Sequence, residues 1–283
     1  MRWIASATSL FTLLIQSIGY HNTAPGAAPL NFCQLRPAFM EDFQHFLINS
    51  WSLDGANWIA HTPWHGDFGD AAFTDPGPDG PFSVVDGALN ITARKGKDGR
   101  WRSGLIAAAD GTGRGHGVRY GYFEARMKLP PGPGTWPAFW LAQLKSPTDT
   151  SPSAEIDVIE YYGQFDGGYH ATLHEWYGNP SQTWFRAKVV EVPAGSLVTG
   201  WHDYGVRILP DRITFFLDRR PVWDQPTPPE LKEPMYPLVD LALGSGWPIT
   251  NTPNPSVLKV RYIHVYQYVQ GGTCDKTSKK TGF

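Results

Sequence analysis

Three carboxylates stand close together in residues 154–163, which read A-E-I-D-V-I-E-Y-Y-G. The β-branched residues between them predict a strand, and because side chains alternate along a strand, Glu155 and Asp157 share one face. Glu160 follows Asp157 at an odd offset, so in a regular strand it points to the opposite face. A β-bulge at residues 158 and 159 would set two residues opposite one and return Glu160 to the first face. We therefore predict a bulged strand that presents three acids on one surface.

Acids arranged in this way are suited to cleavage of a glycosidic bond. One carboxyl group protonates the leaving oxygen, and the other attacks the sugar carbon or activates water. A third acid between them opposes the ionisation of its neighbours, so one group stays protonated near neutral pH. A strand with charged side chains on a solvated face is the alternative, and the E-x-D-x-x-E spacing alone does not exclude it.

The segment before the acidic strand favours the first interpretation. Residues 134–141 read G-T-W-P-A-F-W-L, and a loop rich in Pro, Ser and Thr follows them. Together the two segments resemble glycoside hydrolase family 16, whose laminarinase-like branch carries a G-x-W-P-A-x-W segment shortly before a bulged E-I-D-x-x-E strand. The resemblance extends more loosely over segments from Phe39 to Gly244, which is almost the whole chain beyond its N-terminal segment.

The resemblance implies a role for each acid. Glu155 becomes the nucleophile, Glu160 the general acid/base, and Asp157 the residue that orients Glu155 and helps to tune its proton. It also implies a retaining mechanism, which spacing alone cannot show, because retaining and inverting enzymes differ in the distance between the carboxyl groups.

We therefore expect a secreted, endo-acting hydrolase of a β-linked polysaccharide, with β-1,3-glucan as the leading substrate. An exopolysaccharide or galactan depolymerase of the same family and a transglycosylase remain open. So does a non-catalytic glycan-binding module on the same fold, although such a module is expected to lose at least one carboxylate, and all three are present here.

Tryptophans near the acids are candidate sugar-binding residues. Trp136 and Trp140 share a strand face and could form a platform for a pyranose ring, with core packing as the alternative. Trp247 follows an aliphatic strand and could reach the cleft from a loop.

Histidines are expected on the strand after the acids. A turn at residues 164–168 predicts an antiparallel pair that places His174 near Asp157, and His174 and Trp176 then share a face with His170. We predict His174 and Trp176 as substrate-binding residues and His170 as a structural histidine. His170 and His174 lie about 13 Å apart on a strand, which is too far for one zinc ion.

Two segments depart from the family pattern. Many relatives carry a calcium site that uses an acidic residue near the final strand, but here Arg261 stands in that segment, and a guanidinium cannot ligate calcium. We expect no metal and no cofactor. Residues 65–70 replace a segment with which many β-1,3-glucanases shape the non-reducing subsites, which leaves the glycan open. Glu124 and Arg126 share a strand face and are predicted to form an ion pair, either a structural one or one in the wall of the cleft.

The length suits one domain over residues 29–283, and the many short β-rich runs between Gly, Pro and Asp residues predict an all-β fold. Such strands are best buried in a two-sheet antiparallel β-sandwich, and the family resemblance implies the same fold, of the concanavalin-like jelly-roll type. The chain has 283 residues and a net charge of −2 with no long basic run, so we expect a polysaccharide partner and no nucleic acid. Residues 51–80 are predicted to be long surface loops at the cleft rim. The predicted strands are residues 82–93, 101–108, 118–129, 136–144, 154–162, 169–177, 201–209, 212–217, 236–243 and 257–268.

The N-terminal segment, residues 1–28, begins with a basic residue, continues apolar and ends in small residues, which predicts a secretory signal peptide. The apolar part is short for a membrane anchor, which is the alternative. We expect a monomer outside the cell or in the periplasm, with no membrane contact after processing. Cys33 and Cys274 are predicted to form a disulfide in that oxidising environment, with two free buried thiols as the alternative.

Overall fold

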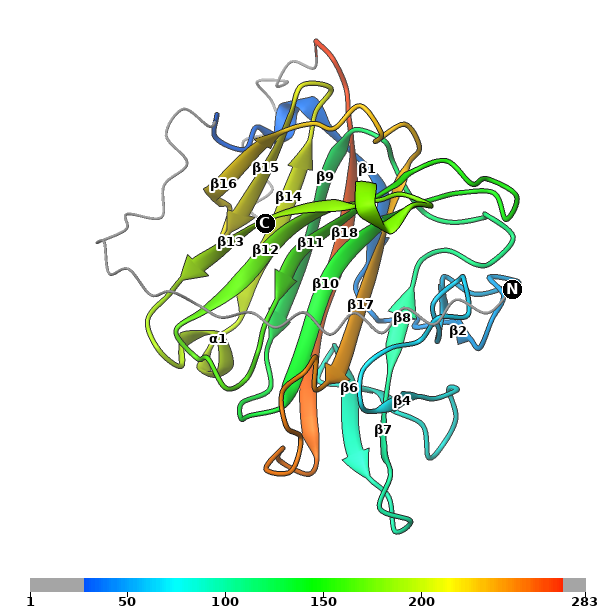
Figure 1. Ribbon diagram of the computed structural model, residues 1–283, viewed down its shortest axis with the longest axis vertical. Helices are drawn as coiled ribbons and strands as arrows, with labels where there is room; N and C mark the ends of the chain where they lie inside the picture. The colour runs from blue at the N-terminus through cyan, green and yellow to red at the C-terminus, as the bar shows by residue number, and fades with distance from the viewer. Residues whose placement is uncertain (1–27, 272–283) are drawn as a thin grey trace.

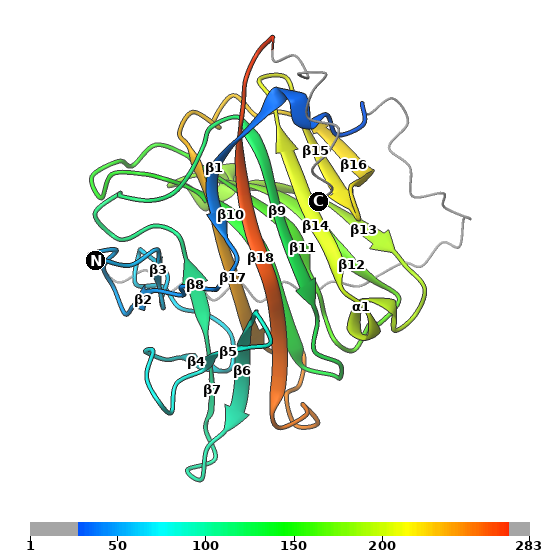
Figure 2. The ribbon, with the colours of Figure 1, turned by 180° about the vertical axis from the view of Figure 1, so that it is seen from behind.

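The computed structural model describes residues 28–271, which form a β-sandwich of two sheets stacked face to face (Figures 1 and 2). The predicted fold class is confirmed. We call the two layers the front sheet and the back sheet, because the first faces the viewer in Figure 1 and the second in Figure 2.

The front sheet carries the acidic strand at its centre. Its eight strands lie in the order β13 (Trp184–Glu191), β12 (Gly168–Trp176), β11 (Ser153–Glu160), β10 (Thr135–Gln143), β17 (Met235–Leu243), β8 (Leu105–Ala107), β3 (Trp58–Ile59) and β2 (Ile48–Asn49).

The back sheet has ten strands. Its main path is β16 (Arg220–Pro226), β15 (Arg212–Leu217), β14 (His202–Ile208), β9 (Gly121–Lys128), β18 (Ser256–Tyr268), β6 (Ala88–Lys95), β7 (Trp101–Ser103) and β4 (Ala72–Phe73). Two further strands, β1 (Leu35–Glu41) and β5 (Phe82–Val85), pair with β18 and β6. Helical turns are confined to η1 (Phe32–Gln34), η2 (Pro180–Gln182) and α1 (Ser196–Thr199) within the described residues.

Nearly all neighbouring strands pair antiparallel, as predicted, but two pairs of short strands run parallel. These are β2 with β3 and β4 with β7. Each of these pairs contains at least one strand from the segment before residue 80. Long loops connect the short strands of this segment, so a strand can enter the sheet parallel to its neighbour.

The main core fills the space between the sheets. The inward positions of β11 are apolar, with Ile156 and Val158 buried against residues of the back sheet such as Phe123 and Val206. Alternation of this kind is what a strand between a core and a cleft requires. The sandwich thus fixes which face of the front sheet remains for chemistry.

A second apolar cluster covers part of the outer face of the front sheet. It combines strand residues such as Trp140 and Leu238 with Ile59 and Phe73 from the segment before residue 80. The prediction that residues 51–80 are surface loops is therefore only partly right. Trp58, Ile59 and Ala60 are fully buried, because this segment packs onto the sheet before its loops reach the cavity.

Each predicted strand segment contains a strand, whereas six strands of the described chain were not predicted: β1, the short β2, β3 and β4, and β13 and β16. In β13 the exposed and buried side chains do not alternate regularly, because it forms the edge of the front sheet. The tight turn between β14 and β15 is confirmed, since the amide of Leu209 donates to the carbonyl of Arg212 at 2.9 Å.

The predicted ion pair between Glu124 and Arg126 is wrong. Glu124 is fully buried and pairs with Arg219 at 2.9 Å, while Arg126 pairs with Asp203 at 2.9 Å. Both residues lie on β9 of the back sheet, so neither forms a wall of the cleft. The side chains of Glu124 and Arg126 lie on the same face of β9, but each is closer to an oppositely charged side chain from another part of the chain than to the other.

The N-terminal end of the described chain packs against the back sheet. Arg207 donates to the carbonyls of Ala28 and Pro29 at 3.1 and 3.2 Å, so the folded domain includes Ala28. The rest of the predicted signal peptide, residues 1–27, lies outside the described residues. Cys274 of the predicted disulfide also lies outside them. No helix within residues 28–271 has the length and apolar character needed to cross a membrane.

Candidate active site

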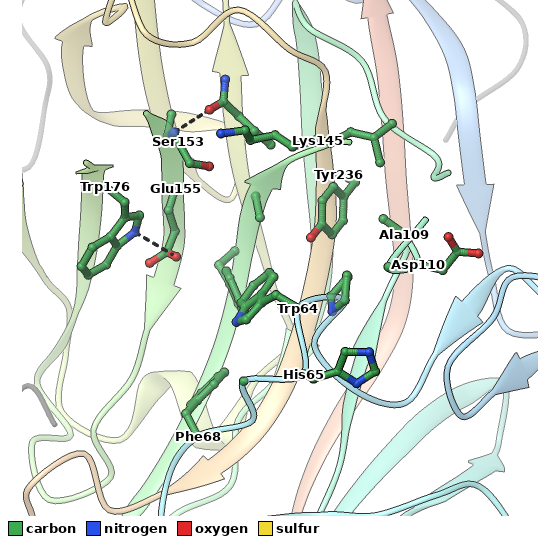
Figure 3. A pocket seen from close by; sticks show the side chains of 18 of the residues that line it. Trp64, His65, Phe68, Ala109, Asp110, Lys145, Ser153, Glu155, Trp176 and Tyr236 are labelled. Atoms are coloured by element: carbon green, nitrogen blue, oxygen red, sulfur yellow. Dashed lines mark hydrogen bonds between the residues drawn. The ribbon is translucent and has the colours of Figure 1, made fainter. Parts of the chain in front are cut away.

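A cavity of about 910 Å³ lies on the outer face of the front sheet (Figure 3). Its floor comes from β10, β11 and β17, and its rim comes from the loops at residues 63–68 and 109–111 and from residues 144–149. Glu155, Asp157 and Glu160 all line it. The outer face of β11 is therefore the floor of a substrate-sized hollow.

A β-bulge in β11 brings the third acid to this face. Asp157 is opposite Trp140 on β10, and Glu160 is opposite Ala138, so three steps along β11 match two along β10. The same shift occurs against β12, between Thr172 and His170. The predicted bulge is confirmed.

The bulge has a packing reason. Val158 and Ile159 are consecutive in sequence, yet both are buried in the main core, at 1% and 0% exposure. A regular strand would place one of them in the cleft. Burying both stabilises the irregular strand and leaves Glu160 in the cavity.

Each acid contacts a side chain on the cavity face. The indole N–H of Trp176 donates to Glu155 at 3.2 Å, and His174 Nε2 lies 3.1 Å from Asp157 Oδ2. His174 thus lies near Asp157, as predicted, although the strand register sets His174 opposite Glu155 and Thr172 opposite Asp157.

Glu160 has donors on three sides. The indole N–H of Trp136 lies 3.2 Å from its Oε1 and the hydroxyl of Tyr162 lies 3.3 Å from the same oxygen, while the hydroxyl of Thr172 donates to Oε2 at 3.4 Å. His170 stands opposite Glu160 and contacts Tyr162 edge to face, and burial lowers its pKa. It is therefore a neutral, packed histidine beside the acids, as expected.

Burial and mutual repulsion control the protons of this cluster. Burial, followed by the negative charge of Asp157, raises the pKa of Glu155 to about 8. Burial and the charges of Glu160 and Asp240 raise the pKa of Asp157 well above its usual range. Burial and these charges therefore disfavour ionisation of Asp157, and a protonated Asp157 would remove one of the charges that oppose ionisation of Glu155.

Asp240 is a fourth carboxyl group that the sequence analysis did not assign to the site. It lines the cavity from β17, is fully buried, and accepts hydrogen bonds from the indole of Trp140 at 2.9 Å and the amide of Ala242 at 3.0 Å. Burial raises its pKa to about 8. Every residue of β17 is buried, so its sequence gives no alternation from which the cavity face could be recognised.

The predicted aromatic residues divide into two groups. Trp136, Trp140 and Trp176 line the cavity, but Trp247 is not among the lining residues and lies edge to face against Phe165. The prediction that Trp247 reaches the cleft is therefore not supported by its position.

The predicted platform of Trp136 and Trp140 also needs correction. Trp140 is only 4% exposed, so it forms part of the floor and offers a sugar little open ring surface. Phe68 contacts both indoles, with ring centroids 5.3 and 6.0 Å away. The sequence analysis assigned no role to Trp64, Phe68 or Tyr236, which also line the cavity. Trp64 and Phe68 come from a loop without periodicity, where sequence gives no direction for a side chain.

One set of side chains at the acidic cluster has the composition of a cation site, although its histidine, His174, is not among the residues that line the cavity. A carboxylate oxygen of Glu155, one of Asp157 and a ring nitrogen of His174 all lie within 4.8 Å of one another. Within this group, Glu155 accepts a hydrogen bond from the indole N–H of Trp176, and His174 Nε2 lies beside Asp157 Oδ2. Arg261, which stands where many relatives carry an acidic calcium ligand, donates to the carbonyl of Asp86 at 2.9 Å.

Residues 83–263, well over half of the chain, match the sequence profile of Glycosyl hydrolases family 16. The chain belongs to this family. Among curated relatives, the endo-1,3-1,4-beta-glycanases EglC and ExsH of Rhizobium meliloti (strain 1021) are 32% and 33% identical over 196 residues. Each alignment covers 66% of this chain and 39% of the relative, so the chain spans about two-fifths of their length.

Solved structures of laminarinases share the sandwich. The catalytic domain of an endo-1,3-beta-glucanase (laminarinase) from Thermotoga petrophila RKU-1 aligns with a TM-score of 0.66 and 21% identity, over 83% of this chain and 98% of that one. The laminarinase from Flavobacterium sp. UMI-01 aligns with a TM-score of 0.61 and 25% identity, over 82% and 100%.

Proposed function

We propose that this family 16 member is an endo-acting, retaining glycoside hydrolase of a β-linked polysaccharide, with β-1,3-glucan as its leading substrate. The observation that carries the proposal is the placement of Glu155, Asp157 and Glu160 on one face of the bulged β11, inside the cavity. The names of the relatives, endo-1,3-1,4-beta-glycanase and laminarinase, support the substrate class.

Glu155 and Glu160 take the two chemical roles. Glu160 donates its proton to the glycosidic oxygen while a carboxylate oxygen of Glu155 bonds to the anomeric carbon and the bond to the leaving sugar breaks. Glu160, now ionised, takes a proton from water, and the oxygen of that water displaces Glu155 from the sugar. Two inversions leave the anomeric configuration unchanged.

Asp157 is a positioning residue in this scheme. Its proton removes a negative charge beside Glu155, which must ionise before it can attack. The indole N–H of Trp176 stabilises the same carboxylate through a hydrogen bond. Burial raises the pKa of Glu155 to about 8, and the proton on Asp157 and the hydrogen bond from Trp176 both act against that rise, towards the ionised form that reacts.

The cavity extends beyond the acids on both sides, which supports cleavage within a polymer. Ala138 and Ala142 on β10 lie opposite Glu160 and Glu155, and the lining continues beyond them to Trp136 at one end and Lys145 at the other. A polysaccharide can therefore extend past the acids in both directions.

The test is purified protein assayed on laminarin, mixed-linkage glucan, agarose, carrageenan and bacterial exopolysaccharides, with products sized and their initial anomeric form followed by NMR. We expect oligosaccharides of several lengths from a β-glucan, with retained configuration. The Glu155→Gln variant should bind the same glycan without cleaving it. Folded wild-type protein that binds a glycan but cleaves none of them would instead indicate a binding module.

We further propose that the chain is exported as a monomer that carries a disulfide between Cys33 and Cys274. The N-terminal sequence pattern supports export, and the pairing of β1 with β18 brings the segments next to both cysteines together, since Leu35 is opposite Tyr268. N-terminal sequencing of the exported protein, mass spectrometry without reduction and size-exclusion chromatography test the three parts.

A further inference from the structure

Trp64 is an exposed aromatic residue on a loop that lines the cavity. Its exposure is 51%, and it lies across the cavity from Glu155 and Trp176, as Figure 3 shows. The indole of Trp64 packs edge to face against that of Trp140, with ring centroids 5.9 Å apart and an interplanar angle of 67°. A large apolar ring that stays open beside a cleft has surface to offer a ligand.

The loop that carries Trp64 is held by hydrogen bonds from its own residues. Asp67 accepts from the amide and the hydroxyl of Thr62 at 3.1 and 3.2 Å, and it lies 2.6 Å from His61 Nδ1. The hydroxyl of Thr62 in turn accepts from the amide of Gly66 at 2.9 Å. The backbone on both sides of Trp64 is therefore tied to one carboxylate.

Stacking on the neighbouring rings supports the loop from a second direction. The ring of Trp51 lies 4.0 Å from that of His61 at 7° and 4.4 Å from that of His65 at 31°. His65 itself has a left-handed backbone, with φ of 56°, which sets the tight turn after Trp64. A loop fixed in this way is organised before any ligand arrives.

Gly66 decides where the indole of Trp64 lies. A Cβ atom at this position would stand 2.6 Å from Cδ1 and 2.7 Å from Nε1 of Trp64, which is closer than real contacts allow. The indole therefore lies directly against the backbone of Gly66, and any side chain there would displace it.

We propose that Trp64 is a sugar-binding platform, which stacks on a pyranose ring of the polysaccharide away from the bond that is cleaved and thereby helps to select the cleavage position. The inference rests on the proposed function. Its ligand class is a neutral β-linked glycan, since the apolar C–H face of such a sugar suits an open indole, and polar groups elsewhere in the cavity supply orientation.

Binding is measured with the Glu155→Gln protein, which retains the ligand without turnover, by calorimetry with laminarin oligosaccharides of increasing length. Adding Trp64→Ala should weaken the binding of long oligosaccharides by about 3- to 10-fold and leave the shortest ones unaffected. Adding Gly66→Ala keeps the indole but moves it, so it should give an intermediate loss. Trp201→Ala is the matched control, because Trp201 stacks under Arg261 and does not line the cavity.

In the active protein, Trp64→Ala should change the lengths of the first products released, while Trp201→Ala should not. Equal affinities and equal product patterns for the two variants would overturn the proposal for Trp64 and leave the proposed function standing. Failure of the Glu155→Gln protein to bind any oligosaccharide would overturn both, and circular dichroism and thermal unfolding of each variant establish that the protein is folded.

Discussion

Glu175→Gln is expected to stabilise the protein at alkaline pH and to change its stability little in acid. Glu175 lies on β12, is fully buried, and neither of its carboxylate oxygens has a hydrogen-bond partner. Burial, and after it the negative charge of Glu230, raises its pKa from 4.5 to about 7. It points away from the cavity, because Trp176, which lines the cavity, is the next residue on the strand and side chains alternate between its faces.

The sign follows from the proton that each state holds. Between pH 4.5 and about 7 the unfolded chain has released the Glu175 proton while the folded protein still keeps it. Stability is therefore fully present below the unfolded pKa and falls as the pH rises towards 7. A pKa raised from 4.5 to about 7 corresponds to a loss of stability of at most about 3 kcal/mol at pH 8, and we expect a measured difference of about 1 to 3 kcal/mol.

Urea unfolding of both proteins between pH 4.5 and pH 8 measures the effect, through the difference in free energy of unfolding at each pH. All other titrating groups are common to the two proteins, so the pH-dependent part of the difference reports on position 175. Glu233→Gln is the control, because Glu233 is exposed in the segment that also carries Glu230. A difference for Glu175→Gln that stays constant with pH, or that shrinks as the pH rises, would refute the reasoning.

Three further changes test other parts of the structure. Glu160→Gln should lower kcat/KM on a polysaccharide by about 10²- to 10⁴-fold, yet much less on a glycoside with an activated leaving group, and equal losses on the two substrates would exclude an acid role. Asp240→Leu should lower the free energy of unfolding by about 1 to 3 kcal/mol, because it leaves the buried indole N–H of Trp140 without an acceptor, whereas Asp240→Asn should cost less; the same cost for both would contradict this account. Arg219→Met should destabilise the protein by about 2 kcal/mol or more in chemical unfolding, because Glu124 is fully buried beside it, and an unchanged midpoint would show that this ion pair is dispensable.

The bulge in β11 was predictable because it follows from local rules. Three acids could share a face only if one residue was inserted between Asp157 and Glu160, and the adjacent apolar pair, Val158 and Ile159, supplied the residues to bury. The antiparallel pairing that brings His174 near Asp157 was predictable too, but its register was not, because the connection over residues 161–167 is too long to fix it, and His174 lies opposite Glu155.

Contacts between distant segments were not predictable in this way. The fourth carboxyl group, Asp240, reaches the cavity from a strand whose residues are all buried, so no alternation marks its face. Trp64 comes from a loop that hydrogen bonds to Asp67 hold in place, and Trp247 contacts Phe165 instead of the cavity. The partners of Glu124 and Arg126 likewise lie on other strands.

The sequence by itself determined the all-β class, the acidic strand with its irregularity, and the chemistry that Glu155, Asp157 and Glu160 suggest, because strand period and turn length act over a few residues. Only the tertiary structure decided which aromatic rings face the cavity and how buried the acids are. Ring exposure and carboxyl pKa depend on atoms from strands and loops far apart in the chain, and packing alone determines which of these meet.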